Sequence, residues 1–165
     1  MSFLSNIRQT LKIAQPADEL TIVDAEDDGI SESAHYKIKQ RFHGITVLGA
    51  EATVHLHGEQ ADFVGRTIAT PAISTVPVIT SDMALERALA DLRDNNVVIR
   101  DLSAEDRLLL GYAKPTTELV LFPSTKPGFP ARLAYQVLAR PNVIDWWEFV
   151  IDAENGDILL KYNRT

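Results

Sequence analysis

The chain has 165 residues, a formal net charge of −7 from 23 acidic and 16 basic side chains, and no cysteine. Its length suits one ordinary domain or two small ones, and 45% hydrophobic and 24% charged residues is a globular composition. The missing cysteines exclude a disulfide scaffold, a thiolate zinc site and a cysteine nucleophile, and the acidic balance argues against nucleic-acid binding. No apolar run is long enough to span a membrane. The first ten residues show no secretory signal, so we expect either a cytoplasmic protein or one whose leader has been removed.

The first half is predicted to be one helix followed by an antiparallel meander. Apolar spacings of one, three and four predict a helix over about residues 2–14, which Pro16 ends. From Glu19 the period becomes two, which predicts a strand that a turn closes in the acidic residues 24–29. Gly49 predicts a bulge or a close backbone approach. Three further alternating segments predict strands, 35–43, 45–57 and 61–68.

The second half repeats the order of helix and sheet. Residues 70–80 hold two prolines and no charge, which predicts an extended connector. Ser81 or Asp82 is expected to cap a helix that ends near residues 94–96. Its predicted apolar stripe is Leu85, Ala88, Leu89 and Leu92.

The rest of the second half is predicted to hold short elements and a final hairpin. A short strand is predicted at 97–99, and a capped helical turn begins at Ser103. Asn155-Gly156 predicts a hairpin with a type I′ turn, because both residues tolerate positive φ. The flanking and preceding strands are predicted at 118–122, 132–139, 147–153 and 158–162.

A search for catalytic motifs assigns no active site. The sequence contains no HExxH, GxSxG, GxxxxGK[ST] or GxGxxG pattern. His55 and His57 would point to one strand face, close enough to share a metal, but no further ligand can be placed beside them. Two solvated histidines are therefore the favoured interpretation, and no catalytic, cofactor-binding or metal-binding residue is predicted.

One predicted strand face is basic in an otherwise acidic chain. This basic stripe consists of His35, Lys37, Lys39, Arg41 and His43. A solvated sheet face is the favoured interpretation, and the alternative is a site that meets an acidic partner surface. The adjacent Trp146 and Trp147 should face opposite sides of a strand, so one belongs to the core and the other either anchors a partner or packs on a neighbouring loop.

The strands also resemble a known family. The segment 36–56 is similar to the aromatic-basic-x-x-Gln, Gly-[VI]-x-Val-x-Gly and Val-His core of the fungalysin/thermolysin propeptide (FTP) motif. The matching positions include Tyr36, Gln40, Gly44, Val47, Gly49 and His55. The second half resembles the PepSY-type subdomain that follows this motif in thermolysin-like precursors, through 118–122, 132–137 and 147–159, with Asp152 and Gly156 at family positions. Two departures are Val64-Gly65, where the family has Asn-Gly, and the stretch 101–115, which has no clear counterpart.

The resemblance implies an α+β protein of two helix-on-antiparallel-sheet, cystatin-like subdomains in tandem. Its subdomains would be FTP-like at 1–70 and PepSY-like at 81–165, with a linker at 71–80. The implied function is a propeptide-type intramolecular chaperone and inhibitor of a secreted thermolysin-like metallopeptidase, without catalysis, cofactor or metal of its own. The implied partner is a protease catalytic domain, in cis or in trans, and the implied location is extracellular or at the cell surface. The alternative is a stand-alone extracellular binding module or trans-acting inhibitor that keeps the fold. The family positions are interpreted as structural.

Overall fold

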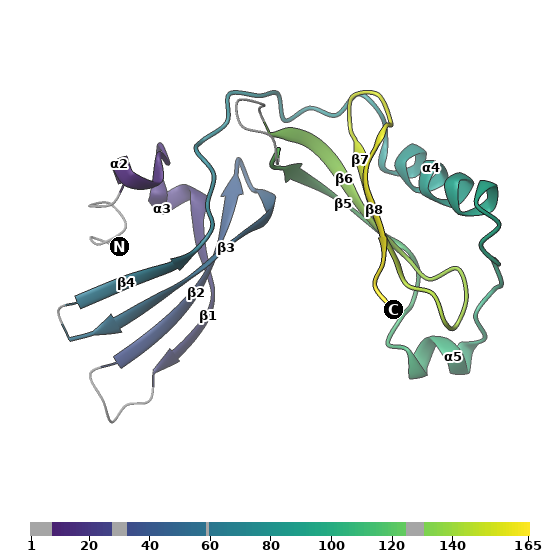
Figure 1. Ribbon diagram of the computed structural model, residues 1–165, viewed down its shortest axis with the longest axis horizontal. Helices are drawn as coiled ribbons and strands as arrows, with labels where there is room; N and C mark the ends of the chain where they lie inside the picture. Colours follow the sequence, from purple (N-terminus) through teal and green to yellow (C-terminus); the bar gives the residue numbers. More distant parts are fainter. Residues whose placement is uncertain (1–7, 28–32, 59, 125–130) are drawn as a thin grey trace. The chain divides into compact units, whose positions relative to one another are not determined.

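The computed structural model describes residues 8–27, 33–58, 60–124 and 131–165. Contacts divide the chain into two compact units, one of residues 1–73 with 123–131 and one of 74–122 with 132–165. The predicted α+β class is confirmed, because each unit combines helix with antiparallel sheet (Figure 1). Among the described residues no helix is long and apolar enough to cross a membrane.

The first unit contains the predicted antiparallel meander. Its strands pair in chain order: β1 (Leu20–Asp27), β2 (Ser33–Phe42), β3 (Ile45–His57) and β4 (Gln60–Gly65). One face of this sheet carries the core, formed by Ile13, Leu20, Ile38, Ala52 and Val54. The opposite face of β2 carries odd-numbered residues, so the charged side chains of the basic stripe are kept away from the core.

The helical segment before this sheet differs from the prediction. The helix α2 (Arg8–Leu11) ends where Lys12 adopts a φ of +54°, and residues 2–7 of the predicted helix lie outside the described residues. The prediction that the helix continues to about residue 14 and is ended by Pro16 is wrong, because it ends at Leu11 and Pro16 begins a second helix, α3 (Pro16–Glu19). Proline is favoured at the first helical position, where its missing N–H has no intrahelical partner to lose.

The prediction of a turn at residues 24–29 is wrong for the described part of that segment. β1 continues through the acidic residues to Asp27, with Asp24 opposite Lys37 and Glu26 opposite His35 on β2. Opposite charges on facing strands favour continued pairing, a tertiary effect that local turn propensity does not contain. Residues 28–29 lie outside the described part of the chain.

Two glycines shape the β2–β3 hairpin, one in its turn and one at a bulge within β3. His43 and Gly44 have φ values of +48° and +80°, the pair of positive angles that a type I′ turn requires. Within β3, Gly49 has a φ of +71° in the segment where the register shifts, between the pairs Lys39–Glu51 and Arg41–Thr46. Within the described part of the chain, and leaving out the two chain neighbours, no heavy atom lies within 4 Å of a Cβ added to Gly49, so the residue supports a bulge and not a close approach.

The fourth strand begins one residue earlier than predicted, at Gln60, and ends three residues earlier, at Gly65. There the backbone passes so close to Ala52 that an added Cβ would lie 2.4 Å from the Ala52 Cα. Beyond this point the N–H and carbonyl of Ile68 form hydrogen bonds with the side chain of Gln40 and not with the backbone of a neighbouring strand. A side chain therefore takes the place that a continued ladder would occupy.

In the second unit one helix lies along one face of the sheet strands of that unit (Figure 1). The helix is α4 (Ser81–Asp94), and the strands pair in chain order: β5 (Thr116–Phe122), β6 (Arg132–Ala139), β7 (Trp147–Asp152) and β8 (Ile158–Asn163). The predicted stripe of α4 faces the sheet, with Ala84, Ala88 and Leu92 fully buried and Leu85 and Leu89 partly buried. The helix-on-sheet arrangement is thus clear in this unit, whereas the described helices of the first unit have four residues each.

Two local predictions in the second unit need correction, and a third is confirmed. The cap of α4 is Thr80, whose Oγ1 accepts a hydrogen bond from the Met83 N–H at 3.2 Å, and neither Ser81 nor Asp82. Residues 97–99 form no strand, because they find no ladder partner and Val98 and Ile99 stay half exposed. The predicted capped turn is confirmed as α5 (Ala104–Leu109), where Ser103 and Asp106 form a capping box.

The final hairpin is confirmed, but its predicted turn type is wrong. Positive φ occurs at Gly156 (+79°) and not at Asn155, whereas a type I′ turn needs both. The Asn155 side chain instead accepts a hydrogen bond from the Asp157 N–H at 2.9 Å, and the Gly156 N–H donates to the Asp152 carbonyl at 2.9 Å. A longer loop with an Asx-type bond therefore joins β7 to β8.

Candidate functional site

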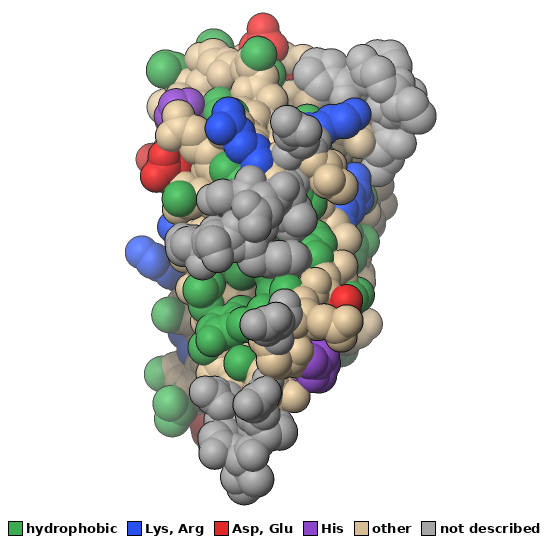
Figure 2. All heavy atoms as spheres, turned by 90° about the vertical axis from the view of Figure 1, so that its left-hand side faces the viewer, with side chains coloured by type: hydrophobic (Ala, Val, Ile, Leu, Met, Phe, Trp, Pro, Cys, Tyr) green, Lys and Arg blue, Asp and Glu red, His purple; other side chains and the backbone are tan. Residues whose placement is uncertain are grey.

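The predicted basic stripe lies on the face of β2 that points away from the core of the first unit. Lys37 Nζ is 3.0 Å from Asp24 Oδ2, and Lys39 Nζ is 3.0 Å from Glu51 Oε1. The hydrogen bond and charge of Asp24, together with the charge of Glu26, raise the pKa of the Lys37 ammonium. Because the neighbouring strands add these carboxylates, the face carries charges of both signs. In the view of Figure 2 Lys and Arg side chains are likewise spread over the surface and form no single patch.

The histidines of the stripe separate into two environments. His43 lies in the turn after β2, with its ring against Phe42 at a centroid distance of 4.3 Å. His35 stays on the strand and faces His55 across the β2–β3 pair, with the two Nδ1 atoms 2.6 Å apart. The prediction that groups His43 with the strand residues is therefore wrong, because the chain turns at that residue.

The pair of histidines considered for a metal is also not the pair that the fold brings together. His57 Nδ1 is 2.9 Å from the Ser33 hydroxyl, while His55 contacts His35. Among the described residues there is no group of three or more His, Asp or Glu side chains arranged to hold a metal ion. Sequence spacing reveals i and i+2 neighbours on one strand, but the cross-strand partner depends on register.

The other family positions of the first unit lie in or near its sheet framework. Gln40 is fully buried, donates from Nε2 to the Ile68 carbonyl at 2.9 Å and accepts the Ile68 N–H at 2.9 Å. Val47 is 1% exposed, and Tyr36 is half-buried against the core. Gln40 therefore has a hydrogen-bonding role, and Val47 and Tyr36 contribute to packing.

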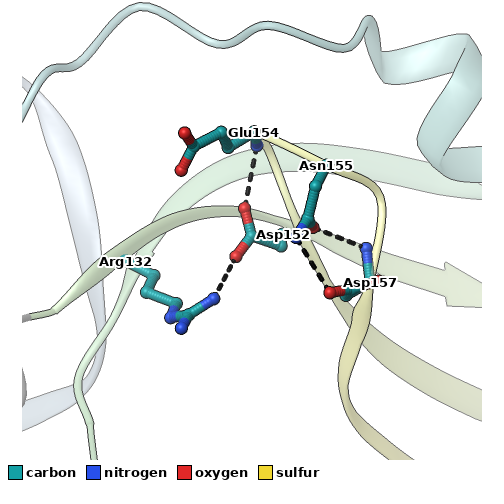
Figure 3. A network of polar contacts seen from close by, with 5 residues as sticks. All are labelled: Arg132, Asp152, Glu154, Asn155 and Asp157. Carbon is teal, nitrogen blue, oxygen red and sulfur yellow. Dashed lines mark hydrogen bonds and ion pairs between the residues drawn. The ribbon is translucent and has the colours of Figure 1, made fainter.

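Asp152 is the centre of a polar network at the last hairpin (Figure 3). Its carboxylate is nearly buried, with Oδ2 accepting from Arg132 Nη1 at 2.7 Å and Oδ1 accepting the Glu154 N–H at 2.8 Å. Close by, Asn155 Nδ2 donates to Asp157 Oδ2 at 2.8 Å. The network fixes the path of the loop between β7 and β8.

Replacing Arg132 by Ala is expected to destabilise the protein by about 1–2 kcal/mol, because the Asp152 carboxylate stays buried and loses its cation. Lys37→Ala is the matched control, since it breaks an exposed ion pair of similar length and should change stability by less than about 1 kcal/mol. Urea denaturation of both variants measures the difference. Equal effects would show that the burial of Asp152 does not matter.

The sequence interpretation missed a second buried carboxylate. Glu148 on β7 is 4% exposed, and three donors surround it: Gln136 Nε2 at 2.7 Å, the Tyr162 hydroxyl at 2.6 Å and Arg164 Nη1 at 3.1 Å. The hydrogen bond to Glu148, followed by burial and the negative charge of Glu148, raises the pKa of the Tyr162 phenol. The donors come from β6, β8 and the residue after β8, so only the three-dimensional register shows the cluster.

The Tyr162 phenol is expected to contribute stability that disappears in alkali. Its pKa is raised in the folded protein, so the contribution is complete below about pH 10, the unfolded value, and is lost as pH rises through the folded value. Tyr162→Phe should therefore lower stability by about 1 kcal/mol at pH 8, with a smaller difference at the alkaline end. Denaturation curves from pH 8 upward test this, and a difference that stays constant or grows with pH would contradict it.

The two tryptophans are both partly buried. Two guanidinium groups contact the Trp146 ring, with the Cζ atoms of Arg140 and Arg164 lying 4.8 and 4.4 Å from its centroid. Trp147 packs against the α4 core, and its Nε1 has no hydrogen-bond partner among the described residues. The structure therefore favours the packing interpretation of Trp146 over that of a free anchor.

Comparison with known proteins finds a family whose model matches the sheet of the first unit. Residues 18–65, which hold β1 to β4, match the Fungalysin/Thermolysin Propeptide Motif. The predicted resemblance to the propeptide region of thermolysin-like peptidases is thereby confirmed.

Three curated relatives are similar to nearly the whole chain. Thermolysin of Alicyclobacillus acidocaldarius subsp. acidocaldarius is 27% identical over 174 residues, covering 98% of this chain and 29% of that protein. Bacillolysin of Brevibacillus brevis is 24% identical, covering 98% and 30%, and thermostable neutral protease NprT of Geobacillus stearothermophilus is 28% identical, covering 89% and 26%. The chain thus spans less than a third of the length of these relatives. Among solved structures, the Bacillus megaterium YpeB C-terminal domain matches with a TM-score of 0.41 at 13% identity, covering 98% of this chain and 60% of that one.

Proposed function

We propose that this chain acts as a propeptide-type chaperone and inhibitor of a thermolysin-like peptidase domain and performs no catalysis itself. The observation that carries the proposal is the propeptide motif at residues 18–65 within a chain that aligns along 98% of its length with less than a third of a thermolysin. In this proposal, an FTP-like subdomain at 1–70 and a PepSY-like subdomain at 81–165 are joined by the linker 71–80, and the protein works outside the cell. The partner is a peptidase domain, joined to the chain or separate from it.

The chaperone activity and the inhibition have the same physical basis, which is preferential binding to the native peptidase. A surface that binds the native peptidase better than its unfolded form stabilises the native state, and the same interface can obstruct substrate binding. Rigid sheets held by buried polar anchors such as Gln40 and Asp152 suit this role, because an ordered surface loses little entropy on binding.

The test is refolding and inhibition in trans. Denatured peptidase domains of the three relatives are diluted with this chain or with an unrelated acidic protein of equal size, and recovered peptidase activity is measured. The folded enzymes are then titrated with the chain. We expect higher recovery and dose-dependent inhibition with at least one enzyme, and neither effect with any of the three would refute the proposal.

We also propose that the polar face of β2 contacts the peptidase. Reversing Lys37, Lys39 and Arg41 to Glu is expected to weaken inhibition by about tenfold, because charged side chains at an interface select for complementary charge. The matched control is the triple reversal of the exposed Arg66, Arg87 and Lys114, which alters net charge equally. Circular dichroism melting verifies that both variants fold. Equal inhibition constants for the two triple variants would remove this face from the interface.

A further inference from the structure

Four titratable side chains form one row across the sheet of the first unit. His35 on β2 is directly opposite His55 on β3. Glu26 on β1 lies opposite His35, and Asp62 on β4 lies opposite His55. Directly opposed residues point to the same face with Cβ atoms about 4.5–5.5 Å apart. The order across the four strands is therefore acid, imidazole, imidazole, acid, on the face away from the core.

The two central rings converge on one point. Their Nδ1 atoms are 2.6 Å apart, and the ring planes cross at 80° with centroids separated by 4.7 Å. Both side chains are half-buried, so the rings are confined yet reachable from solvent. His57 lies beside them with its ring centroid 6.3 Å from that of His35, and its own Nδ1 is engaged by Ser33. The two neighbouring nitrogens can share one proton, or both can offer lone pairs to one cation.

We propose that His35 and His55 form a binding site for a divalent transition-metal ion such as Zn²⁺, Ni²⁺ or Cu²⁺. Imidazole nitrogen suits these ions, whereas Mg²⁺ and Ca²⁺ prefer oxygen ligands. Two zinc–nitrogen bonds of about 2.0–2.1 Å at a tetrahedral angle place the nitrogens roughly 3.3 Å apart. The rings therefore need to separate by less than about 1 Å, which small side-chain rotations provide.

The flanking carboxylates support a cation at this point. Glu26 and Asp62 bring negative charge to the two sides of the pair, while the nearest cation along β2, Lys37, is bound to Asp24. Because the described residues contain no group of three or more ligands around one position, the site is a two-imidazole chelate whose remaining positions water fills. This inference goes beyond the proposed function and involves no peptidase.

The experiment titrates the metal-free chain with ZnCl₂, NiCl₂, CuCl₂ and MgCl₂ by isothermal calorimetry at neutral pH. We expect one Zn²⁺ per chain and no Mg²⁺ binding. His35→Gln and His55→Gln should each weaken Zn²⁺ binding by at least about tenfold, since even outer-shell changes typically reduce metal affinity 10- to 100-fold. His43→Gln is the matched control, because its ring packs on Phe42 away from the pair, and it should leave the affinity unchanged.

A second measurement keeps the proposal testable if a variant fails to fold. In the unaltered chain, Zn²⁺ should shift the NMR signals of the His35 and His55 rings and leave those of His43 in place. Absence of zinc binding, shifts at His43 in place of the pair, or equal affinities in all three variants would overturn the site. Since none of these measurements involves a peptidase, their failure is distinguishable from a failure of the proposed function.

Discussion

Gly65→Ala is expected to destabilise the first unit by roughly 3–4 kcal/mol, because a methyl group has no space at the end of β4. A Cβ at this position would lie 2.4 Å from Ala52 Cα, 2.5 Å from Ala52 Cβ and 2.5 Å from the Glu51 carbonyl oxygen. The residue also has a φ of +151°, a region that side chains rarely occupy. The two strands would have to separate where Arg66 N–H bonds to Glu51 at 2.9 Å.

Gly44→Ala separates the two causes. Gly44 also has positive φ, +80°, but nothing lies within 4 Å of an added Cβ, so only the backbone strain of about 1–2 kcal/mol is expected. Thermal or urea unfolding of both variants, compared with the unaltered chain, measures the difference. If Gly65→Ala loses no more stability than Gly44→Ala, the close approach of β4 to β3 is absent in solution.

Strand β2 and the helix of the second unit could be predicted from the sequence because their patterns are local. The period of two in residues 36–42 predicts a strand, and the apolar stripe of 85–92 predicts a helix. Both elements are confirmed. Local turn chemistry was less reliable. Asn155-Gly156 has the composition of a type I′ turn, yet the paired positive φ values occur at His43-Gly44. The register of the strands and the carboxylate of Asp152 decide the loop shape, and neither is visible in a window of four residues.

The charge of a sheet face could not be predicted from one strand. Four residues of the basic stripe lie on β2 and His43 lies in the turn after it, but the carboxylates that pair with Lys37 and Lys39 come from β1 and β3. In the same way, the contact of His35 with His55 joins residues 20 positions apart through the register of the hairpin. Which residues face each other across the hairpin depends on the register of β2 and β3. That register is set by the turn and the β-bulge once the strands pair.

The same limit applies to buried polar residues. A glutamine within an alternating strand indicates a polar group facing the core, but the sequence does not say which backbone it bonds. In the structure Gln40 binds both the N–H and the carbonyl of Ile68, 28 residues away, just after β4 ends. Its carboxamide therefore replaces two ladder hydrogen bonds and holds the start of the connector against the sheet.

Gln40→Met keeps the length of the side chain but removes both hydrogen bonds, so we expect a loss of roughly 2–4 kcal/mol. Each backbone group of Ile68 that loses a partner near the core accounts for part of this loss, because Gln40 itself is fully buried. Gln60→Met on the exposed part of β4 is the matched control and should change stability by less than about 0.5 kcal/mol. Amide hydrogen exchange gives the second measurement: the Ile68 N–H should exchange faster in Gln40→Met and at an unchanged rate in Gln60→Met. Protection of Ile68 that survives the loss of the Gln40 carboxamide would show that another acceptor holds the connector.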